Sequence, residues 1–382
     1  MSGPILRVEG LSVEYVVGTG RFQALSDVSF AMPPHEVVGI VGETGCGKST
    51  LGHAIPRLLP EPPARVKAGR IFYRGIDLLA LPRWKMPTVR GTEIGMIFQE
   101  PINSLNPAYR IFSQVAEAVH IRRMRESGRT PRLRPVEPHD YSRPPSPDVT
   151  ASLLKPILPG GAAGGAGRPS APSAGSRAEL RREVLDFLRL VRINDPETIL
   201  DLYPHELSGG MRQRIMIAMA LSAKPSLLIA DEPTSALDVT IQAQVLTLMK
   251  ELMEEVDTSI LFVSHDLGVI AEIADQVGVM YAGHLVEFGP VADVFERPQH
   301  PYTKALLRSV PNRYKADGAL PALPGSVPNL ARLPAGCTFH PRCPIVRPVC
   351  RADPSPPLEA HASDRPTHRS ACLFAGEVEG LP

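Results

Sequence analysis

The sequence predicts an α/β fold in which helices flank a parallel sheet, and three observations support this prediction. Between residues 225 and 279, short apolar runs alternate with helical segments, as expected when strands and helices follow one another in a parallel sheet. The run Val37–Val41 is short and apolar, which fits a strand buried on both faces. A glycine-rich loop follows this run directly and leads into a helical segment.

The expected elements can be placed in chain order. Residues 5–41 read as strands. The helical segment after the glycine-rich loop contains Pro56, and we expect it to end or kink there because a proline inside a helix costs roughly 3 kcal/mol. Residues 180–191 carry apolar side chains at helical spacing. Beyond residue 225 we expect strands at 227–230, 260–263 and 277–280, and helices at 237–253 and 267–274.

The composition is that of an ordinary soluble protein. The chain has 382 residues, 43% of them hydrophobic and 21% charged, with a formal net charge of +1. This charge gives no general attraction to nucleic acid. The longest apolar runs fall well short of the roughly 20 residues that a membrane-spanning helix needs. The N-terminus, MSGPILRVEG, lacks the apolar core of a signal peptide. We therefore expect a cytoplasmic protein that relies on other chains for any membrane pore.

The middle of the chain is of low complexity. Residues 127–175 are rich in proline, glycine, serine and alanine, so they offer too little apolar surface to offset the entropy of ordering. We expect a disordered insertion there. Its front, residues 122–134, carries six arginines against one glutamate. A solvated loop explains this charge, and contact with anionic lipid headgroups is the alternative.

The glycine-rich loop matches the phosphate-binding pattern G-x-x-x-x-G-K-[ST] in full. It comprises Gly42, Glu43, Thr44, Gly45, Cys46, Gly47, Lys48, Ser49 and Thr50. Backbone N–H groups of such a loop, together with the following helix N-terminus, form a cradle for phosphate groups. We expect Lys48 to reach the outer phosphates and Ser49 to hold Mg²⁺. The strand before the loop and the helix after it disfavour a chance glycine-rich turn; Cys46 is expected to be inert.

A second nucleotide-binding feature is the segment LLIADEP at 227–233. Its apolar residues end in Asp231 and Glu232. A carboxylate at the tip of a buried strand beside the phosphate loop suits Mg²⁺ coordination through water, and we assign this to Asp231. Glu232 is then placed to polarise an attacking water. Such a pair often only caps a helix, but the phosphate loop favours the catalytic interpretation.

Further motifs resemble those of ABC-type ATPases. LSGGMRQR at 207–214 is similar to the family signature, and its Ser208, Gly209 and Gly210 present a hydroxyl and N–H groups at a helix N-terminus. Gln99 matches the Q-loop glutamine, Asp238 the D-loop and His265 the switch histidine. Tyr15 lies where the family places an aromatic ring against adenine. Ordinary loop or strand roles are the alternatives for Gln99, His265 and Tyr15.

The resemblance implies a fold and a mechanism. The fold is an ABC ATPase cassette with a RecA-like core, an antiparallel β subdomain and an α-helical subdomain. We expect the cassette over residues 1–290, its helical subdomain over about 100–224, and a small extension over 291–382. In the family, two subunits close on ATP held between the phosphate loop of one and the signature of the other. Gln99 then senses Mg²⁺ and the attacking water, while Glu232 and His265 orient that water.

Other stretches resemble importers of oligopeptides, dipeptides or nickel. They are FQEPINSLNP at 98–107, YPHELSGGMRQR at 203–214, HPYTKALLRSVP at 300–311 and GCTFHPRCP at 336–344. The long insertion departs from those importers. The resemblance implies a peripheral subunit on the cytoplasmic face of the cell membrane. Its partners would be a second ABC ATPase subunit in a heterodimer, two permease subunits and an extracytoplasmic substrate-binding protein. The cargo would be peptides, with nickel or another small solute as the alternative.

Four cysteines cluster near the C-terminus: Cys337, Cys343, Cys350 and Cys372. Four thiolates can hold either a tetrahedral zinc ion or a four-iron cluster, and the spacing alone does not choose between them. His340, His361 and His368 are alternative zinc ligands. The resemblance to peptide-importer tails favours a 4Fe-4S cluster, because some members of that group hold one. A small proline-rich segment needs a cross-link such as a bound metal to fold.

Three other classes of function are possible. One is a mainly regulatory partner subunit whose C-terminal region senses metal or redox state. A soluble ABC ATPase that acts on nucleic acid or ribosomes usually has two cassettes or long coiled coils, and this sequence has one cassette and no sustained heptads. An exporter ATPase is disfavoured by the HPYTKALLRSVP stretch and the cysteine tail. We therefore expect an ATPase coupled to import and no nucleic-acid partner.

Overall fold

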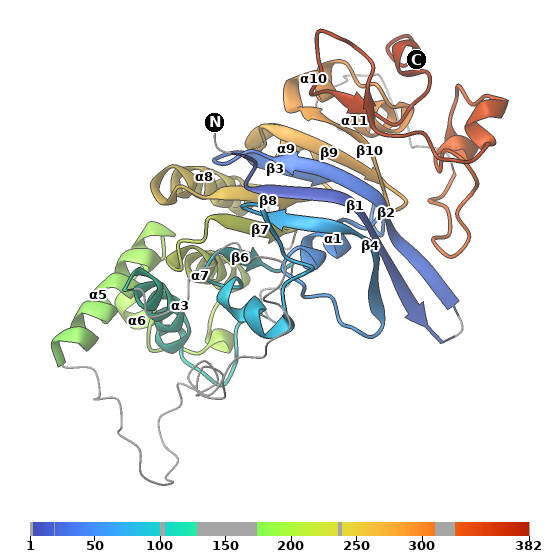
Figure 1. Cartoon of the computed structure of the whole chain (residues 1–382). Coiled ribbons are helices and arrows are strands. Elements are labelled where there is room, and N and C mark those ends of the chain that lie inside the picture. The colour runs from blue at the N-terminus through green and yellow to red at the C-terminus, as the bar shows by residue number, and fades with distance from the viewer. Residues whose placement is uncertain are drawn as a thin grey trace.

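The computed structural model describes residues 3–18, 20–99, 104–127, 174–235, 239–309 and 325–381. In this part of the chain, two sheets lie next to each other, with a helical region on one side and the C-terminal extension on the other (Figure 1). Residues 128–173 of the expected insertion and Asp238 lie outside the described residues; residues 174 and 175, expected to be disordered, are the first two of a helix. Among the helices described, none is long and apolar enough to cross a membrane.

The larger sheet contains the strands that were expected from the apolar runs. Its order in the described residues is β11-β12-β10-β9-β3-β8-β7-β6. The pairs from β9 to β6 through β3, β8 and β7 are parallel, whereas β10 pairs antiparallel with β9 and with β12. The strands are β3 (Val37–Val41), β6 (Ile94–Ile97), β7 (Leu227–Asp231), β8 (Ser259–Val263), β9 (Gln276–Tyr281), β10 (His284–Pro290), β11 (Glu359–Ala360) and β12 (Arg369–Ser370).

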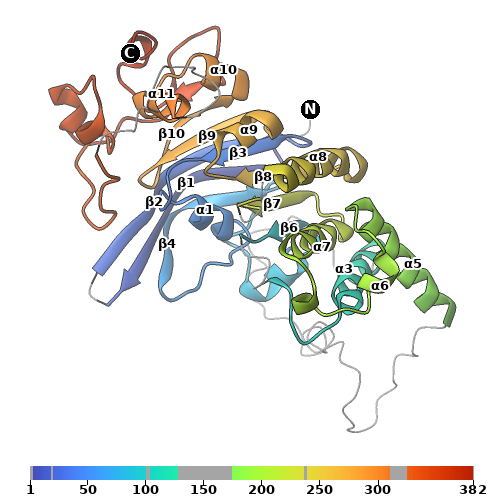
Figure 2. The same cartoon turned by 180° about the vertical axis from the view of Figure 1, so that it is seen from behind.

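The smaller sheet is antiparallel and is built mainly from the N-terminal strands. Its order is β2-β1-β4-β5 in the described chain. The strands are β1 (Leu6–Val17), β2 (Gly20–Met32), β4 (Ala64–Tyr73) and β5 (Ile76–Asp77). The long hairpin of β1 and β2, with β4 beside β1, extends past the edge of the larger sheet, as both views show (Figures 1 and 2).

The central strands are apolar along their whole length because their two faces fill two different cores. In β7, Leu227 and Ile229 pack in the core shared with the antiparallel sheet, whereas Leu228 and Ala230 pack in the core under the helices. The alternation follows from the two-residue period of a strand. This explains why the sequence shows continuous runs rather than an apolar and polar alternation.

Some helices cover the larger sheet, and others form a separate helical group beside it. They are α1 (Lys48–Ala54), α3 (Ile111–Glu126), α5 (Ala174–Leu190), α6 (Pro196–Ile199), α7 (Gly209–Ser222), α8 (Val239–Val256), α9 (Leu267–Ile273), α10 (Val291–Glu296) and α11 (Pro301–Arg308). Short 3₁₀ turns are η1 (Arg83–Thr88), η3 (Pro204–Glu206), η4 (His340–Arg342), η5 (Pro348–Arg351) and η6 (Ala375–Glu377). Helix α1 ends before Pro56, as expected. Helices α3, α5, α6 and α7 gather on the side away from the C-terminal extension (Figure 2).

The C-terminal extension is attached to the sheet rather than folded around a core of its own. Strand β12 pairs with β10, and the Nε2 of His368 lies 2.8 Å from the Oε1 of Glu287, with both side chains fully buried. Phe339 contacts the rings of Tyr281 and Tyr302 and belongs to the core under the helices. The small proline-rich segment is thus ordered by packing its buried side chains against the core of the larger sheet.

Candidate functional site

The phosphate loop lies between β3 and α1, as the sequence predicts. Gly42 follows the strand with φ 155°, and a Cβ there would come within 2.2 Å of the Met280 carbonyl oxygen. Gly47 has φ 106°, and a Cβ would come within 2.5 Å of the Ala24 carbonyl oxygen. Side chains are therefore excluded at both ends of the loop, which lets the backbone turn tightly before α1 begins at Lys48.

Lys48 is buried and points back across its own loop. Its Nζ donates hydrogen bonds to the carbonyl oxygens of Gly42 at 2.9 Å and Glu43 at 3.2 Å. Cys46 is fully buried, and burial raises the pKa of its thiol above the ordinary value. A raised thiol pKa opposes thiolate formation, which fits the expectation that Cys46 is chemically inert.

Ser49 and Asp231 meet although they are far apart in the sequence. The Ser49 hydroxyl donates a hydrogen bond of 3.0 Å to the Asp231 carboxylate at the end of β7. Burial raises the pKa of Asp231, while the hydrogen bond from Ser49 and the nearby His53 oppose this shift. A hydroxyl and a carboxylate at this distance are the oxygen ligands that Mg²⁺ takes in nucleotide sites.

Glu232 lies at the centre of a second group at the same edge of the sheet. Gln99 Nε2 donates a 3.1 Å hydrogen bond to one of its carboxylate oxygens, and His265 Nδ1 lies 3.2 Å from the other. Glu232 adopts φ 46°, a left-handed conformation unusual for a residue other than glycine, and its N–H donates to the Val263 carbonyl. The strained backbone is held by the neighbouring strand, as is common at functional sites.

His53 also lies beside this site, although no sequence motif indicates it. Its ring lies four residues after Ser49 on α1 and donates through Nδ1 to the Ser49 carbonyl at 2.7 Å, while remaining 3.9 Å from Asp231. The same ring stacks against Phe98 with centroids 6.0 Å apart. The sequence signal for His53 is its position four residues after Ser49, which places both residues on one face of the helix that begins at the phosphate loop.

The remaining sequence-predicted residues lie apart from this group. Tyr15 is half-buried near the end of β1, where it pairs with Phe22 and Ala64. Ser208 caps α7, its hydroxyl accepting a 3.3 Å hydrogen bond from the N–H of Met211. Ser208 and Gly209 are exposed, so the N-terminus of α7 is open to a partner.

The four C-terminal cysteines line one small pocket together with Phe339 and Phe374. Burial raises the pKa of Cys337 to about 11 and that of Cys372 to about 12, and it also raises the pKa of Cys343. Within the described residues, no group of three or more His, Cys, Asp or Glu side chains stands at metal-ligand geometry. The structure therefore brings the thiols to one place without forming a finished coordination site.

The alternative histidine ligands have other partners. His361 Nε2 faces the Ser370 carbonyl at 2.9 Å, and His368 bonds Glu287. His340 lines the cysteine pocket, but its Nδ1 bonds the Cys337 carbonyl at 3.0 Å. Of the candidate donors in the described chain, the cysteines are thus the better set for a metal.

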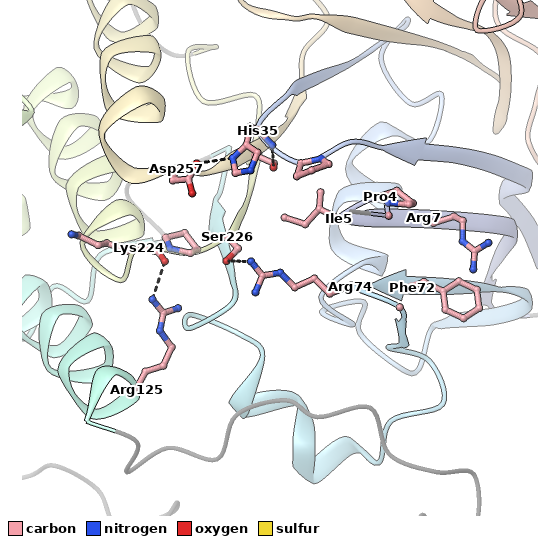
Figure 3. Close-up of a pocket in the computed structure, with 15 residues that line it drawn as sticks. Pro4, Ile5, Arg7, His35, Phe72, Arg74, Arg125, Lys224, Ser226 and Asp257 are labelled. Carbon is pink, nitrogen blue, oxygen red and sulfur yellow. Dashed lines mark hydrogen bonds and ion pairs between the residues drawn. The ribbon is translucent and has the colours of Figure 1, made fainter. Parts of the chain in front are cut away.

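A separate pocket of about 930 Å³ lies at the opposite edge of the larger sheet. Its lining includes Ser259 at the amino end of β8. Ser226, just before β7, and the side chains of Arg74 and Arg125 also line it (Figure 3). Arg74 donates to the Ser226 hydroxyl and Arg125 to the Lys224 carbonyl, so both guanidinium groups are already engaged. Because the phosphate loop follows the carboxyl end of β3, this larger pocket plays no part in the candidate site.

Two family profiles match the chain. The profile described as ABC transporter matches residues 25–235. The profile described as the C-terminal region of oligopeptide/dipeptide transporters matches residues 286–350. The second match begins in β10 and includes three of the four clustered cysteines.

Curated relatives match over nearly the whole chain. A probable peptide ABC transporter ATP-binding protein of Sinorhizobium fredii is 42% identical over 99% of this chain and 97% of its own length. The oligopeptide transport ATP-binding protein OppD of Bacillus subtilis is 41% identical over 88% of this chain and 80% of its own length. The dipeptide transport ATP-binding protein DppD of the same organism is 42% identical, over 91% and 88%.

Solved structures share the fold. A dimeric ATP-binding cassette, MJ0796, in a post-hydrolysis state with ADP and Pi, superposes with a TM-score of 0.55 at 22% identity, and it covers 75% of this chain and 98% of its own. The likeness confirms the fold class that the sequence predicts, an α/β cassette with an antiparallel β part and a helical part.

Proposed function

Because this chain belongs to the ABC transporter family, we propose that it binds and hydrolyses ATP to power the import of oligopeptides or dipeptides. One observation carries the proposal. The candidate nucleotide-binding and catalytic residues lie at a single edge of the parallel sheet, directly after the strands that hold them; they are Lys48, Ser49, Gln99, Asp231, Glu232 and His265. The peptide cargo is supported by the C-terminal profile match and by the names of the relatives, which describe oligopeptide and dipeptide transport.

In this proposal, the phosphate loop holds the triphosphate. The loop residues 42–50 supply backbone N–H groups, and the buried Lys48 exchanges its two carbonyl partners for phosphate oxygens. Ser49, Asp231 and Gln99 are suited to hold Mg²⁺ directly or through water, and the ion would neutralise charge that develops on the transferred phosphoryl group. Tyr15 is proposed to lie against the adenine ring.

Hydrolysis is assigned to the group around Glu232. Its carboxylate is proposed to accept a proton from the attacking water, and Gln99 and His265, which contact its two oxygens, orient it for that task. Proton acceptance by a positioned side chain typically contributes about 10²–10⁴-fold to a rate. Lys48 stabilises the charge on the γ-phosphate as the bond to the leaving group breaks.

The active unit is proposed to be a heterodimer of ATPase subunits. The N-terminal end of α7, with Ser208 and Gly209 exposed and Gly210 half-buried, would contact the γ-phosphate held by the partner. Loss of that phosphate removes a ligand shared by both subunits, so they reopen. We propose that the segment after Gln99 faces the permeases and transmits this motion. The chain would act peripherally at the cytoplasmic face of the membrane.

We also propose that Cys337, Cys343, Cys350 and Cys372 hold a structural metal centre, a 4Fe-4S cluster or a zinc ion. The thiols share one pocket, which supports the proposal. The pocket encloses about 20 Å³, which is room for one ion. Such a centre would staple the proline-rich extension to the cassette. Iron, acid-labile sulfide and zinc measured on anaerobically purified protein separate the alternatives, and protein free of all three would defeat both.

The experiment on transport uses the assembled complex. The chain is co-expressed with its permeases and partner ATPase and placed in lipid nanodiscs, and phosphate release is measured with its substrate-binding protein. We expect stimulation when that protein carries a di- or oligopeptide. Stimulation by nickel in place of peptide would instead support the alternative cargo, and no stimulation by either would contradict the proposed import function.

A further inference from the structure

The C-terminal extension contacts the phosphate loop itself, through a residue almost 300 positions away. Arg342 donates to both carboxylate oxygens of Glu43, at 2.9 and 3.1 Å. The Arg342 side chain is only 5% exposed. A charge-assisted bidentate pair is stronger and more directional than a neutral hydrogen bond. Glu43 is the second residue of the loop pattern, so the contact reaches the loop directly.

Each polar group of Glu43 has a defined partner. Its N–H donates to the Tyr302 hydroxyl at 2.9 Å, and its carbonyl accepts from Lys48 Nζ at 3.2 Å and from the Cys46 N–H at 3.2 Å. Arg342 takes the one remaining group, the carboxylate. The conformation of Glu43 is therefore fixed from three directions, two of which come from elements outside the loop.

Aromatic rings hold Arg342 in place. Its guanidinium lies 5.7 Å from the centre of the Tyr281 ring and 6.0 Å from that of Phe339, and it donates at 3.4 Å to the Tyr281 hydroxyl. Burial alone would lower the pKa of Arg342, but its bonds to Glu43 and Tyr281 outweigh this and raise it. The guanidinium is thus a fixed positive charge and a preorganised donor pair.

We propose that Arg342 is a positioning residue of the ATP site, which turns the Glu43 carboxylate away from the phosphates and cancels its charge. The inference rests on the proposed function only in that the loop binds ATP. An unpaired carboxylate in the second position of the loop repels a triphosphate. The C-terminal extension is therefore a working part of the nucleotide site, and removing its arginine weakens ATP binding without touching the groups that perform hydrolysis.

The experiment compares three variants of the full chain in the assembled complex. Arg342→Met keeps the length of the side chain and removes its charge. The double variant Glu43→Gln/Arg342→Met also removes the carboxylate that would repel the nucleotide. The control is Arg347→Met, in the same extension. It breaks a half-exposed ion pair in which one nitrogen, Nη2, contacts both carboxylate oxygens of Glu377, and this pair does not include a residue of the loop.

The expected result is a change in KM rather than in kcat. Arg342→Met raises the KM for Mg-ATP about tenfold, as expected for losing a charge-assisted bidentate pair, and leaves kcat within about twofold. The double variant returns KM to within about threefold of wild type, because the repelling charge is gone. Arg347→Met behaves as wild type. If Arg342→Met is not folded, Arg342→Lys serves instead. Its expected KM is about threefold higher than that of wild type, because lysine cannot donate two parallel hydrogen bonds to the carboxylate.

Two results would overturn the inference. One is an unchanged KM in the folded Arg342 variant while wild-type protein binds ATP. The other is a raised KM that the Glu43→Gln exchange does not recover, because the arginine then acts through something other than the carboxylate. Wild-type protein that binds no ATP would instead refute the proposed function, so the two failures are distinguishable.

Discussion

Replacing Glu232 with glutamine tests the assignment of the catalytic carboxylate. Glutamine has the same length and can keep one oxygen toward Gln99 or His265, which contact the two carboxylate oxygens at 3.1 and 3.2 Å. It cannot accept a proton from water. If the full contribution of a general base is lost, turnover falls by about 10²–10⁴-fold, which corresponds to about 2.7–5.4 kcal/mol in the barrier.

The same variant is expected to bind ATP almost as well as wild type, because the phosphate loop and Ser49–Asp231 pair are untouched. Phosphate release at saturating Mg-ATP is measured in the assembled complex, and the dissociation constant for a fluorescent ATP analogue is measured on the same preparation. The control is His265→Ala, which removes one of the two contacts to Glu232 and is expected to lose less activity. Full turnover in Glu232→Gln would refute the assignment.

Two further predictions concern the extension and the stability of the chain. Cys372→Ser is expected to lower the bound metal from one centre per chain to near zero, whereas the control Cys46→Ser is expected to keep it. Elemental analysis of the two purified variants measures the metal content. Equal metal content in both variants would contradict the assignment. Burial lowers the pKa of His284 below its ordinary value, so its contribution to stability is present above about pH 6.5 and is lost as the pH falls below that value. His284→Gln is therefore expected to show a smaller drop in melting temperature between pH 7.5 and 5.5 than wild type, and parallel curves for the two proteins would argue against it.

The central sheet was predictable from the sequence because its signal is local. The run Val37–Val41 is apolar throughout and is followed at once by the loop, so both the strand and its position in the site follow from neighbouring residues. Asp231 and Glu232 end a similar run. Carboxyl ends of parallel strands lie at one edge of a sheet, which explains why residues distant in sequence meet there.

The role of the C-terminal extension was not predictable in the same way. The pair formed by Arg342 and Glu43 joins residues 299 positions apart, and neither residue belongs to a periodic pattern. Strand β12 is only two residues long, and it pairs with β10 over those two residues, which is too short a segment to give a strand pattern in the sequence. The sequence did indicate that the four cysteines belong together, and they do share a pocket. Their spacing could not indicate which part of the cassette they would lie against.

The most direct measurement of the central claim is binding of Mg-ATP to the full chain by equilibrium dialysis. Lys48 is buried, and the partners of its Nζ, which are the carbonyls of Gly42 and Glu43 and the Sγ of Cys46, all belong to the loop, so Lys48→Ala removes the cation without disturbing the sheet. We predict saturable binding of one ATP per chain in wild type and an affinity at least about 100-fold weaker in the variant. Equal affinity in the two proteins would show that this loop does not hold the nucleotide.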